Sequence, residues 1–354
     1  MGSIPRGISA SRGAAVLGLS EFQTPLDVFQ RIMEERNPGW NIAHGYTLPP
    51  EPDNAAIRFG QAFEGAVIKL AEIAQNKKIE GRELFYSVNA YPGDPVFERR
   101  QGKELANYIT CHIDGRYTSS GILHEGKTTS IMAYREKWGA PGTDRIPQTY
   151  QVQAQHQMLC TGAKEEILSV LVFPKTPDEW EKDGWTAQPE GTLRNGDNEK
   201  SALLRYWNCS DWALSLCAMG YFHQYNISAN QEAQRRMVEV YREFWHKNIL
   251  EEIPPEPRNY EDIKRLMPEP KSTIIVPDYI ESKIAEYKGI TEETSNAKKR
   301  KDRLKTIITK YVITHGSEGI EDDESREAVI FRNGSGEKLA SWYKDKNGKL
   351  IFRS

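Results

Sequence analysis

Two short strand-like runs joined by a Thr-Ser-Ser-Gly turn place the strongest constraint on the fold of this chain of 354 residues. The runs are 112–116 and 123–127. Alternating residues of a strand point to opposite faces, so Glu125 and Lys127 share one face. If the two runs pair as a β-hairpin, Asp114 lies beside them. Two carboxylates and one ammonium group then converge at one point.

This combination of side chains is the one that metal-dependent hydrolysis of a phosphodiester requires. Mg²⁺ prefers oxygen ligands and keeps several waters, so one or two carboxylates plus a substrate phosphate can hold it. A neighbouring lysine can orient or deprotonate the attacking water and add positive charge near the phosphate. The alternative is a solvated hairpin, because Asp, Glu and Lys are common on protein surfaces and short motifs often match by chance.

A helix predicted over 59–70 adds a third carboxylate. Its apolar residues recur with a helical period, which places Glu64 beside the buried stripe. A carboxylate there needs a partner. Glu64 is therefore either a third acidic group at the metal, direct or through water, or a surface residue that pairs with Arg58 or Lys69.

A second predicted helix, 150–159, carries a glutamine at every second position. Val152, Gln155 and His156 lie on one face of that helix. An uncharged amide can hydrogen-bond a metal-bound water or a phosphate without changing the charge of the site. Glutamine also has good helix propensity and often simply faces water, and both interpretations remain open.

The amino-terminal stretch 6–20 reads as hydroxyl caps before a short apolar helix. Capping alone explains Ser9 and Ser11. A helix amino terminus that carries serines together with Arg6 and Arg12 is also suited to binding an anion.

Taken in order, these motifs resemble the lambda-exonuclease-like, YqaJ-type viral recombinase nucleases, a branch of the restriction-endonuclease-like PD-(D/E)xK superfamily. The resemblance covers roughly residues 4–175. It rests on Ser9-Ala10-Ser11, Leu17-Gly18-Leu19-Ser20 with Thr24-Pro25, Phe59-Gly60 to Glu64, Asp114-Gly115, Glu125 with Lys127-Thr128-Thr129, and Gln153 with Gln155. It implies an α/β (α+β) fold: a restriction-endonuclease-like core with a mixed central sheet flanked by helices.

The resemblance also implies roles for individual residues. Asp114 and Glu125 match the family's metal ligands, and Lys127 matches its catalytic lysine. Glu64 matches a helix-borne acidic residue, and Gln155 matches a glutamine close to the nucleophilic water. The residues expected to grip the 5′ phosphate are Ser11 with Arg6 or Arg12, and Ser9 beside them.

The activity implied is that of a Mg²⁺-dependent exonuclease, for which Mn²⁺ can substitute. It would degrade linear double-stranded DNA from 5′ to 3′ in phage-type recombination, as a homotrimer working with a single-strand annealing protein. Two alternatives stay open. One is an endonuclease or a host repair nuclease with the same active site, and the other is a DNA-end binding module without turnover.

Two residues depart from the family pattern. Gly126 stands where an apolar residue usually separates the glutamate from the lysine, and Ile113 stands where proline often precedes the aspartate. Glycine in a strand adds backbone entropy and removes a core contact, so we expect a kink or a close approach of DNA at Gly126.

Composition limits the other possibilities. The chain has 38% hydrophobic residues and no apolar run that approaches eighteen residues, so we expect no membrane span. We expect a soluble cytoplasmic protein, located in the host cytoplasm if it is phage-encoded. A net charge of −3 provides no overall attraction for nucleic acid, so any DNA site must be locally basic. The four cysteines lack CxxC spacing and predict neither zinc nor disulfides.

We expect a nuclease domain over 1–268 with a surface excursion at 175–200, a linker at 269–277, and an appendage at 278–354. The appendage is predicted to be helix plus β-meander, because Asn333-Gly334 and Asn347-Gly348 are strong hairpin signals. Its basic run, 298–303, is either a solvated helix face or a contact for phosphate or a partner. His112 and His124 flank the carboxylates, and they are either core residues supporting the ligands or ligands themselves.

Overall fold

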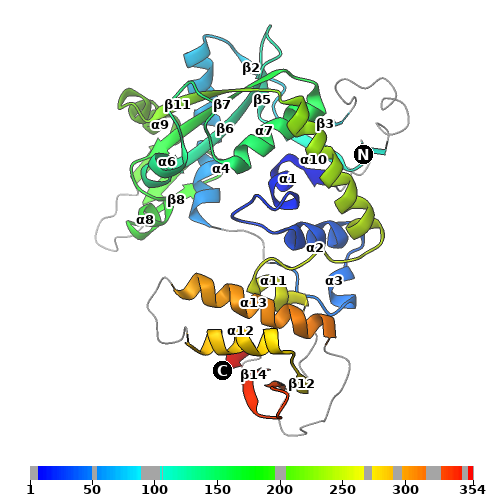
Figure 1. Cartoon of the computed structure of the whole chain (residues 1–354). Helices are drawn as coiled ribbons and strands as arrows, with labels where there is room; N and C mark the ends of the chain where they lie inside the picture. The colour runs from blue at the N-terminus through cyan, green and yellow to red at the C-terminus, as the bar shows by residue number, and fades with distance from the viewer. Residues whose placement is uncertain are drawn as a thin grey trace. The chain divides into compact units, whose positions relative to one another are not determined.

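The computed structural model describes residues 7–49, 54–88, 104–105, 107–195, 205–266, 273–289, 297–315, 328–344 and 350–353. By its internal contacts the chain divides into two compact units (Figure 1). The first unit consists of Met1–Phe22 and Pro50–Lys247, and the second of Gln23–Pro49 and Asn248–Ser354. The sequence predicted a single domain over 1–268, whereas the second unit combines segments from both sides of the first.

Side-chain bonds within the second unit explain why an early segment belongs to it. The Thr24 hydroxyl donates to Asp262 at 2.9 Å, and the guanidinium of Arg265 pairs with both Asp27 and Asp262. The indole N–H of Trp40 donates to Glu252 at 2.8 Å. Except for the Arg265–Asp262 pair, these bonds join residues more than 200 positions apart, a link that local sequence patterns do not reveal.

The first unit is built on a mixed sheet of five strands. In sheet order they are β11 (Phe222–Ser228), β7 (Glu165–Phe173), β6 (Leu123–Ser130), β5 (Gly115–Tyr117) and β2 (Ile79–Glu80). Strands β6 and β7 run parallel, and the other neighbours are antiparallel. The inner strand β7 is buried from its second residue to its last, as its continuous apolar run predicted.

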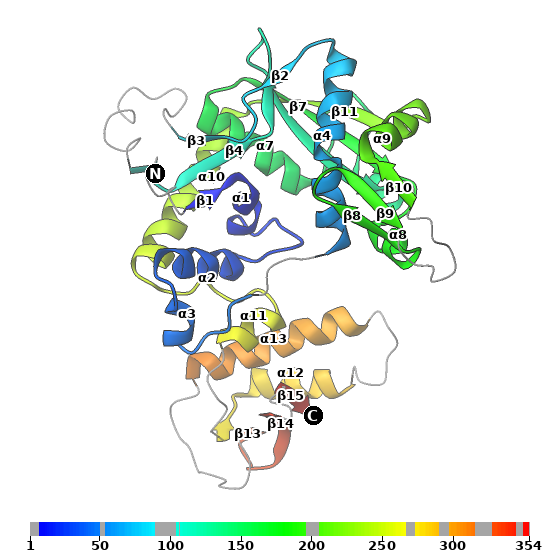
Figure 2. The ribbon, with the colours of Figure 1, turned by 180° about the vertical axis from the view of Figure 1, so that it is seen from behind.

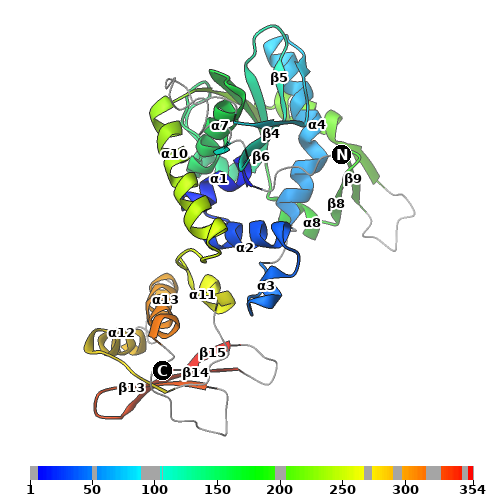
Figure 3. The same cartoon turned by 90° about the vertical axis from the view of Figure 1, so that its right-hand side faces the viewer.

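Long helices cover the two faces of this sheet (Figure 3). They are α4 (Ala55–Gln75) and α7 (Gln148–Thr161). A Cβ on Gly126 would lie 3.2 Å from Val67, so this face of β6 packs against α4. The alternate residue Glu125 contacts α7 through Gln153 and Gln157. The predicted fold class, a mixed central sheet flanked by helices, is confirmed.

A second, three-stranded sheet leads into the hairpin. Its order is β1 (Ile8–Ser9), β4 (Ile109–Ile113) and β3 (Leu84–Ser87), with β1 parallel and β3 antiparallel to β4. The chain passes from β4 to β5 through Asp114 and Gly115. Gly115 has φ +149°, and a Cβ there would lie 2.4 Å from the Ile79 side chain. Only glycine fits this crossing.

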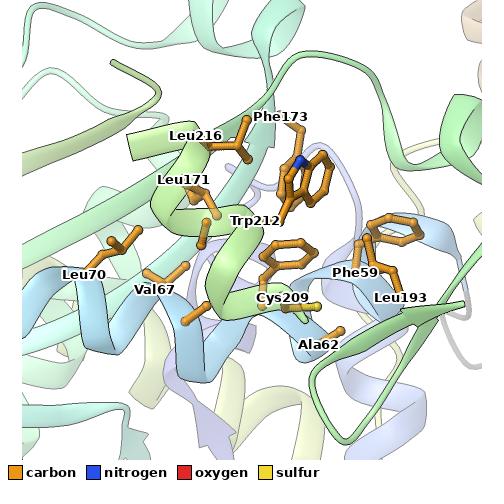
Figure 4. Close-up of a cluster of buried hydrophobic side chains, with 13 residues drawn as sticks. Phe59, Ala62, Val67, Leu70, Leu171, Phe173, Leu193, Cys209, Trp212 and Leu216 are labelled. Atoms are coloured by element: carbon orange, nitrogen blue, oxygen red, sulfur yellow. The ribbon is translucent and has the colours of Figure 1, made fainter. Parts of the chain in front are cut away.

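Residues 175–195 are part of the packed structure and not the surface excursion that we expected. They form α8 (Pro177–Lys182), β8 (Trp185–Gln188) and β9 (Thr192–Asn195), and β9 pairs with β10 (Arg205–Asn208). Leu193 is fully buried beside Phe59 and Trp212 (Figure 4). The tryptophans of this region anchor it to α4, because apolar rings gain more by burial than by exposure. Residues 196–200 lie outside the described part.

The remaining helices of the first unit complete its layers. They are α1 (Ala10–Val16), α6 (Ile131–Lys137), α9 (Cys209–Ala218) and α10 (Gln231–Glu243), and the chain continues into a π-helix at Phe244–Leu250. The sequence predicted one helix over 228–248. The helix instead begins after Asn230, whose side chain accepts from the N–H of Ala233.

The second unit contains helices and a four-stranded sheet (Figure 2). The helices are α2 (Pro25–Arg36), α3 (Trp40–Ala43), α11 (Tyr260–Leu266), α12 (Asp278–Gly289) and α13 (Ala297–His315). The strands, in sheet order, are β12 (Thr273–Ile275), β13 (Ala328–Arg332), β14 (Lys338–Lys344) and β15 (Leu350–Arg353). Helices α12 and α13 and the antiparallel strands β13–β15 lie within 278–354, where the sequence predicted helix plus β-meander. The predicted linker 269–277 contains β12, which pairs with β13; its residues 269–272 lie outside the described part.

Within the described residues, no helix is both long enough and apolar enough to span a bilayer.

A buried histidine couples the fold of the first unit to pH. His156 of α7 is fully buried, and its ring bonds the Thr110 carbonyl at 3.0 Å and the Tyr241 hydroxyl at 3.3 Å. Burial lowers the pKa of His156 to about 4. The unfolded chain takes up this proton near pH 6.5. His156 therefore contributes stability above that pH, and the contribution is lost as the pH falls towards 4.

We expect the free energy of unfolding to fall with this protonation by about 3 kcal/mol between pH 7 and pH 4. His156→Gln keeps an N–H donor for Thr110 but has no proton to gain, so its loss over the same range should be smaller by that amount. Urea denaturation at both pH values measures the difference. Identical losses in the two proteins would contradict the assignment.

Candidate active site

The carboxylates of Asp114 and Glu125 are brought together by the β5–β6 hairpin. Gly115 pairs with His124 and Arg116 with Leu123. The N–H of Gly126 donates to Asp114 Oδ2 at 2.8 Å, which fixes Asp114 beside the middle of β6. The predicted hairpin is therefore present from Gly115 onward. Its first residues, His112 and Ile113, belong to β4 instead, because β3 supplies their strand partners, Phe85 and Leu84.

Lys127 completes the group as the strand period predicted. Its ammonium donates to Glu125 Oε1, and its Nζ lies 5.3 Å from the centre of the Tyr150 ring. Burial lowers the pKa of Lys127, but the neighbouring Glu125 and Asp114 outweigh it and hold that pKa above its usual range. Lys127 is thus a cation in this arrangement, able to orient a water or a phosphate oxygen through its N–H groups.

Asp114 is electrostatically crowded. Burial, followed by repulsion from Glu125, raises the pKa of Asp114 to about 7, although Lys127 and the N–H of Gly126 oppose the rise. Two neighbouring carboxylates, of which Glu125 is buried and Asp114 half-buried, favour binding of a divalent cation, which neutralises both. Their hard oxygen donors match the preference of Mg²⁺. The residues present therefore fit the Mg²⁺ that the resemblance implies.

The site offers a pair of protein ligands. In the described part of the chain, no three His, Cys, Asp or Glu side chains are grouped so that they could hold a metal ion. One or two carboxylates are enough for Mg²⁺, which completes its octahedron with water and substrate phosphate. Asp114 and Glu125 are the residues that would hold it.

Two glutamines of α7 hold Glu125 in place. Gln153 Nε2 donates to Glu125 Oε1 at 2.6 Å, and Gln157 Nε2 donates to Oε2 at 2.7 Å. Gln157 also donates to the carbonyl of His112 at 3.2 Å. The two glutamines are four residues apart, a helical spacing that places them on one face. That spacing was the signal in the sequence for Gln157, which we had not singled out.

The structure places Gln155 elsewhere and so corrects our expectation for it. Its Nε2 donates to the Ser228 carbonyl at 2.8 Å, and its Oε1 accepts from the Asn230 N–H at 2.8 Å. Gln155 lines a polar cavity of about 630 Å³ together with Asp144 and Gln151. Residues 153 and 155 differ by about 200° around a helix, so only one of them can face Glu125.

Glu64 lies at the edge of the group. Its carboxylate pairs with Arg82 at 3.0 Å, and 37% of its side chain is exposed. It is close enough to contribute weakly to the raised pKa of Asp114. The predicted third carboxylate is thus within electrostatic reach of the pair, with Arg82 as its direct partner.

The predicted anion site at the amino terminus is described only in part. The hydroxyls of Ser9 and Ser11 lie 3.0 Å apart, and Arg12 Nη1 donates to the Gly7 carbonyl at 3.2 Å. Ser9 pairs with Thr110 of β4, the strand that leads into Asp114. Arg6 lies outside the described residues.

The two histidines near the carboxylates have different surroundings. His124 is buried on the α4 face of β6, opposite Glu125, and burial lowers its pKa to about 4. Its ring meets Tyr117 edge-on at 5.8 Å. His112 lies in β4, and its ring contacts Phe85 with centroids 5.3 Å apart. The face of β6 on which His124 lies favours the core role that we had considered for it.

One acidic neighbour escaped the sequence analysis. Glu166 is 1% exposed at the start of β7, and neither carboxylate oxygen has a hydrogen-bond partner. Burial, and then the charge of Glu125, raises the pKa of Glu166 well above its usual range. The surroundings of Glu166 therefore favour its neutral form. Its position at the head of a buried strand was the available signal.

Comparisons with known proteins agree with the resemblance. Residues 5–164 match the model of the YqaJ-like viral recombinase domain. No match appears among curated proteins.

Several solved structures resemble the chain weakly. An alkaline exonuclease from Laribacter hongkongensis, LHK-Exo, is 15% identical, with a TM-score of 0.41, covering 70% of this chain and 90% of that chain. LHK-Exo in complex with dAMP gives 14% identity, a TM-score of 0.40 and the same coverages of 70% and 90%. A phage-related exonuclease from Haemophilus somnus is 13% identical with a TM-score of 0.40, covering 70% of this chain and 96% of that chain.

Proposed function

Residues 5–164 belong to the YqaJ-like viral recombinase family, and from this premise we propose that the chain is a Mg²⁺-dependent deoxyribonuclease. Its substrate is linear double-stranded DNA, degraded from the ends in the 5′ to 3′ direction during phage-type recombination. The observation that carries the proposal is the meeting of Asp114, Glu125 and Lys127 at one hairpin of the matched domain.

Each residue of the group has a distinct task in this proposal. Asp114 and Glu125 would hold Mg²⁺, and Gln153 and Gln157 fix the position of the Glu125 carboxylate. When bound, the metal lowers the pKa of a water and neutralises charge on the phosphate. The Lys127 ammonium positions the attacking water and donates to a phosphate oxygen.

The direction of degradation depends on the amino-terminal residues that are proposed to bind the end of the DNA strand. Ser11 and Arg12 are proposed to bind the 5′ phosphate of the strand that is cut, with Ser9 and Arg6 beside them. Support comes from the pairing of β1 with β4, which brings this segment to the strand preceding Asp114. A single-strand annealing protein as partner and a homotrimer as the working form are proposed on family likeness alone.

Timed digestion of labelled DNA tests this function. We expect release of nucleotides from a linear duplex with Mg²⁺ and none with EDTA, while covalently closed circles stay intact. A duplex with 5′-phosphate ends should be degraded faster than one with 5′-hydroxyl ends, and Ser11→Ala should narrow that difference.

Each alternative gives a different result in the same assay. Cleavage of closed circles identifies an endonuclease. Binding of DNA ends without Mg²⁺-dependent nucleotide release identifies a module without turnover. Either result contradicts the proposed exonuclease.

A further inference from the structure

The second unit contains the strongest concentration of positive charge in the sequence. Helix α13 has seven Lys or Arg residues against one Asp, a net charge of +6 over 19 residues, in a chain whose net charge is −3. Its apolar stripe is already used, because Leu304 and Ile308 are buried in the core formed with α12 and the sheet. Arg303 is exposed and lies outside that core.

Three lysines of this unit gather around two tyrosine rings. The Nζ atoms of Lys264 and Lys305 lie 5.1 Å and 3.4 Å from the centre of the Tyr260 ring. The Nζ of Lys301 lies 4.7 Å from the centre of the Tyr287 ring. We call Lys264, Lys301 and Lys305 the lysine cluster. It joins α11 to α13, so its cations are held together by the fold.

The cations of the cluster repel one another. Burial, followed by the charge of Lys264, lowers the pKa of Lys305 to about 8, and Lys301 adds to this effect. An anion bound among these ammonium groups would relieve the repulsion and restore the charge. The geometry therefore favours a ligand that presents several negative charges to one face.

We propose that the lysine cluster and the adjoining face of α13 bind the phosphate backbone of duplex DNA. A helix of this length is roughly 28 Å long, and a single DNA strand presents a phosphate about every 3.4 Å along its axis. A continuous polyanion can therefore engage charges along the helix that a small anion cannot. The inference rests on the proposed function, because that function makes duplex DNA the substrate.

Within the cluster, Lys264 also pairs with Glu261. Three basic residues outside the cluster are paired with other acids. Arg300 and Lys283 are both committed to Glu286, and Lys310 pairs with Glu256 at 2.7 Å. Lys283 is on α12 and pairs with Glu286 at 3.0 Å, which makes it a matched control: a lysine of the same unit, outside the cluster.

The salt dependence of DNA binding tests the proposal. Binding of a labelled duplex is measured with Ca²⁺ in place of Mg²⁺ at several KCl concentrations, for the wild type, Lys301→Gln/Lys305→Gln and Lys283→Gln. Each lost phosphate contact reduces the slope of log K against log salt by about 0.9, so the double variant should lose about 2 and the control nothing. Lys301→Arg/Lys305→Arg should retain the wild-type slope.

Lys264→Gln covers the case in which the double variant fails to fold, because it removes one cation of the cluster from α11 and leaves α13 unchanged. It should reduce the slope by about 1. Slopes equal to the wild type in the folded Gln variants would overturn the proposal and would leave an acidic protein partner as the ligand of this face. Mg²⁺-dependent cleavage by the wild type is scored separately, so loss of the nuclease proposal and loss of this one are distinguishable.

Discussion

Asp114→Asn should reduce Mg²⁺-dependent DNA cleavage by about a thousandfold or more, because it removes one of two carboxylates available to the metal. The amide oxygen can still accept from the Gly126 N–H, which lies 2.8 Å away, so the hairpin should keep its shape. Asparagine also ends the repulsion between Asp114 and Glu125 that raises the aspartate pKa. The variant should therefore be at least as stable as the wild type in EDTA.

Lys127→Met should reduce cleavage to a similar degree by a different route. It removes the ammonium that contacts Glu125, while the metal ligands remain. Mg²⁺ binding should therefore persist in Lys127→Met and be lost in Asp114→Asn. Initial rates on a linear duplex and calorimetric Mg²⁺ titration provide the two readouts.

Glu80→Gln is a suitable control, since Glu80 is an exposed acid of β2 in the same sheet. It should cleave at the wild-type rate. Wild-type cleavage by folded Asp114→Asn or Lys127→Met would contradict the assignment of the site.

Gly13→Ala should destabilise the first unit by about 3 kcal/mol, the upper range for forcing extra volume into a packed core. A Cβ on Gly13 would lie 2.2 Å from the Tyr241 hydroxyl and 3.2 Å from His156 Nδ1. Tyr241 is fully buried and cannot swing into solvent. Helix α1, which carries Ser11 and Arg12, would therefore be pushed away from α7 and α10.

Tyr241→Phe should rescue much of this loss, because it removes the atom that the new methyl group would strike. The single variant Tyr241→Phe measures the cost of leaving His156 Nδ1 without the hydroxyl, which lies 3.3 Å away. Denaturation of the four proteins completes a double-mutant cycle, and we expect a favourable coupling between the two changes. Purely additive effects, or a Gly13→Ala variant as stable as the wild type, would show that the contact is not as close as described.

The central group was predictable because its geometry is local. Glu125 and Lys127 are two residues apart on one strand, so the strand period alone places them together. The chain reverses within a few residues, which brings Asp114 to the same place. By contrast, β4 pairs with β3, whose register joins Phe85 to His112 and Leu84 to Ile113. That pairing redirects the first half of the predicted hairpin, and no local pattern reveals it.

Which glutamine contacts Glu125 is decided by the rotation of α7 about its axis. Gln153 and Gln155 both belong to the motif, but the helix can present only one of them to β6. The rotation is set by buried contacts such as His156 with Thr110, which join distant parts of the chain. A four-residue spacing between Gln153 and Gln157 favoured the observed face, whereas the resemblance favoured Gln155.

Residues 175–200 contain two opposing patterns: turn-forming residues, and large apolar residues that favour packing. Glycine, proline and asparagine predicted a surface segment at 175–200, yet its tryptophans and Leu193 are the residues that pack on α4. Their apolar area outweighs the turn signals, because burial of large rings is among the strongest local contributions to packing. The division into two units likewise depends on bonds such as Thr24 to Asp262, separated by 238 positions.

Crystals soaked in Mn²⁺ and measured at the manganese absorption edge provide the most direct test that Asp114, Glu125 and Lys127 form one metal-dependent site. We expect an anomalous peak bound by carboxylate oxygens of both Asp114 and Glu125, and its disappearance in Asp114→Asn. A peak bound elsewhere, or the two carboxylates directed into separate surroundings with Mn²⁺ present, would contradict the nuclease site.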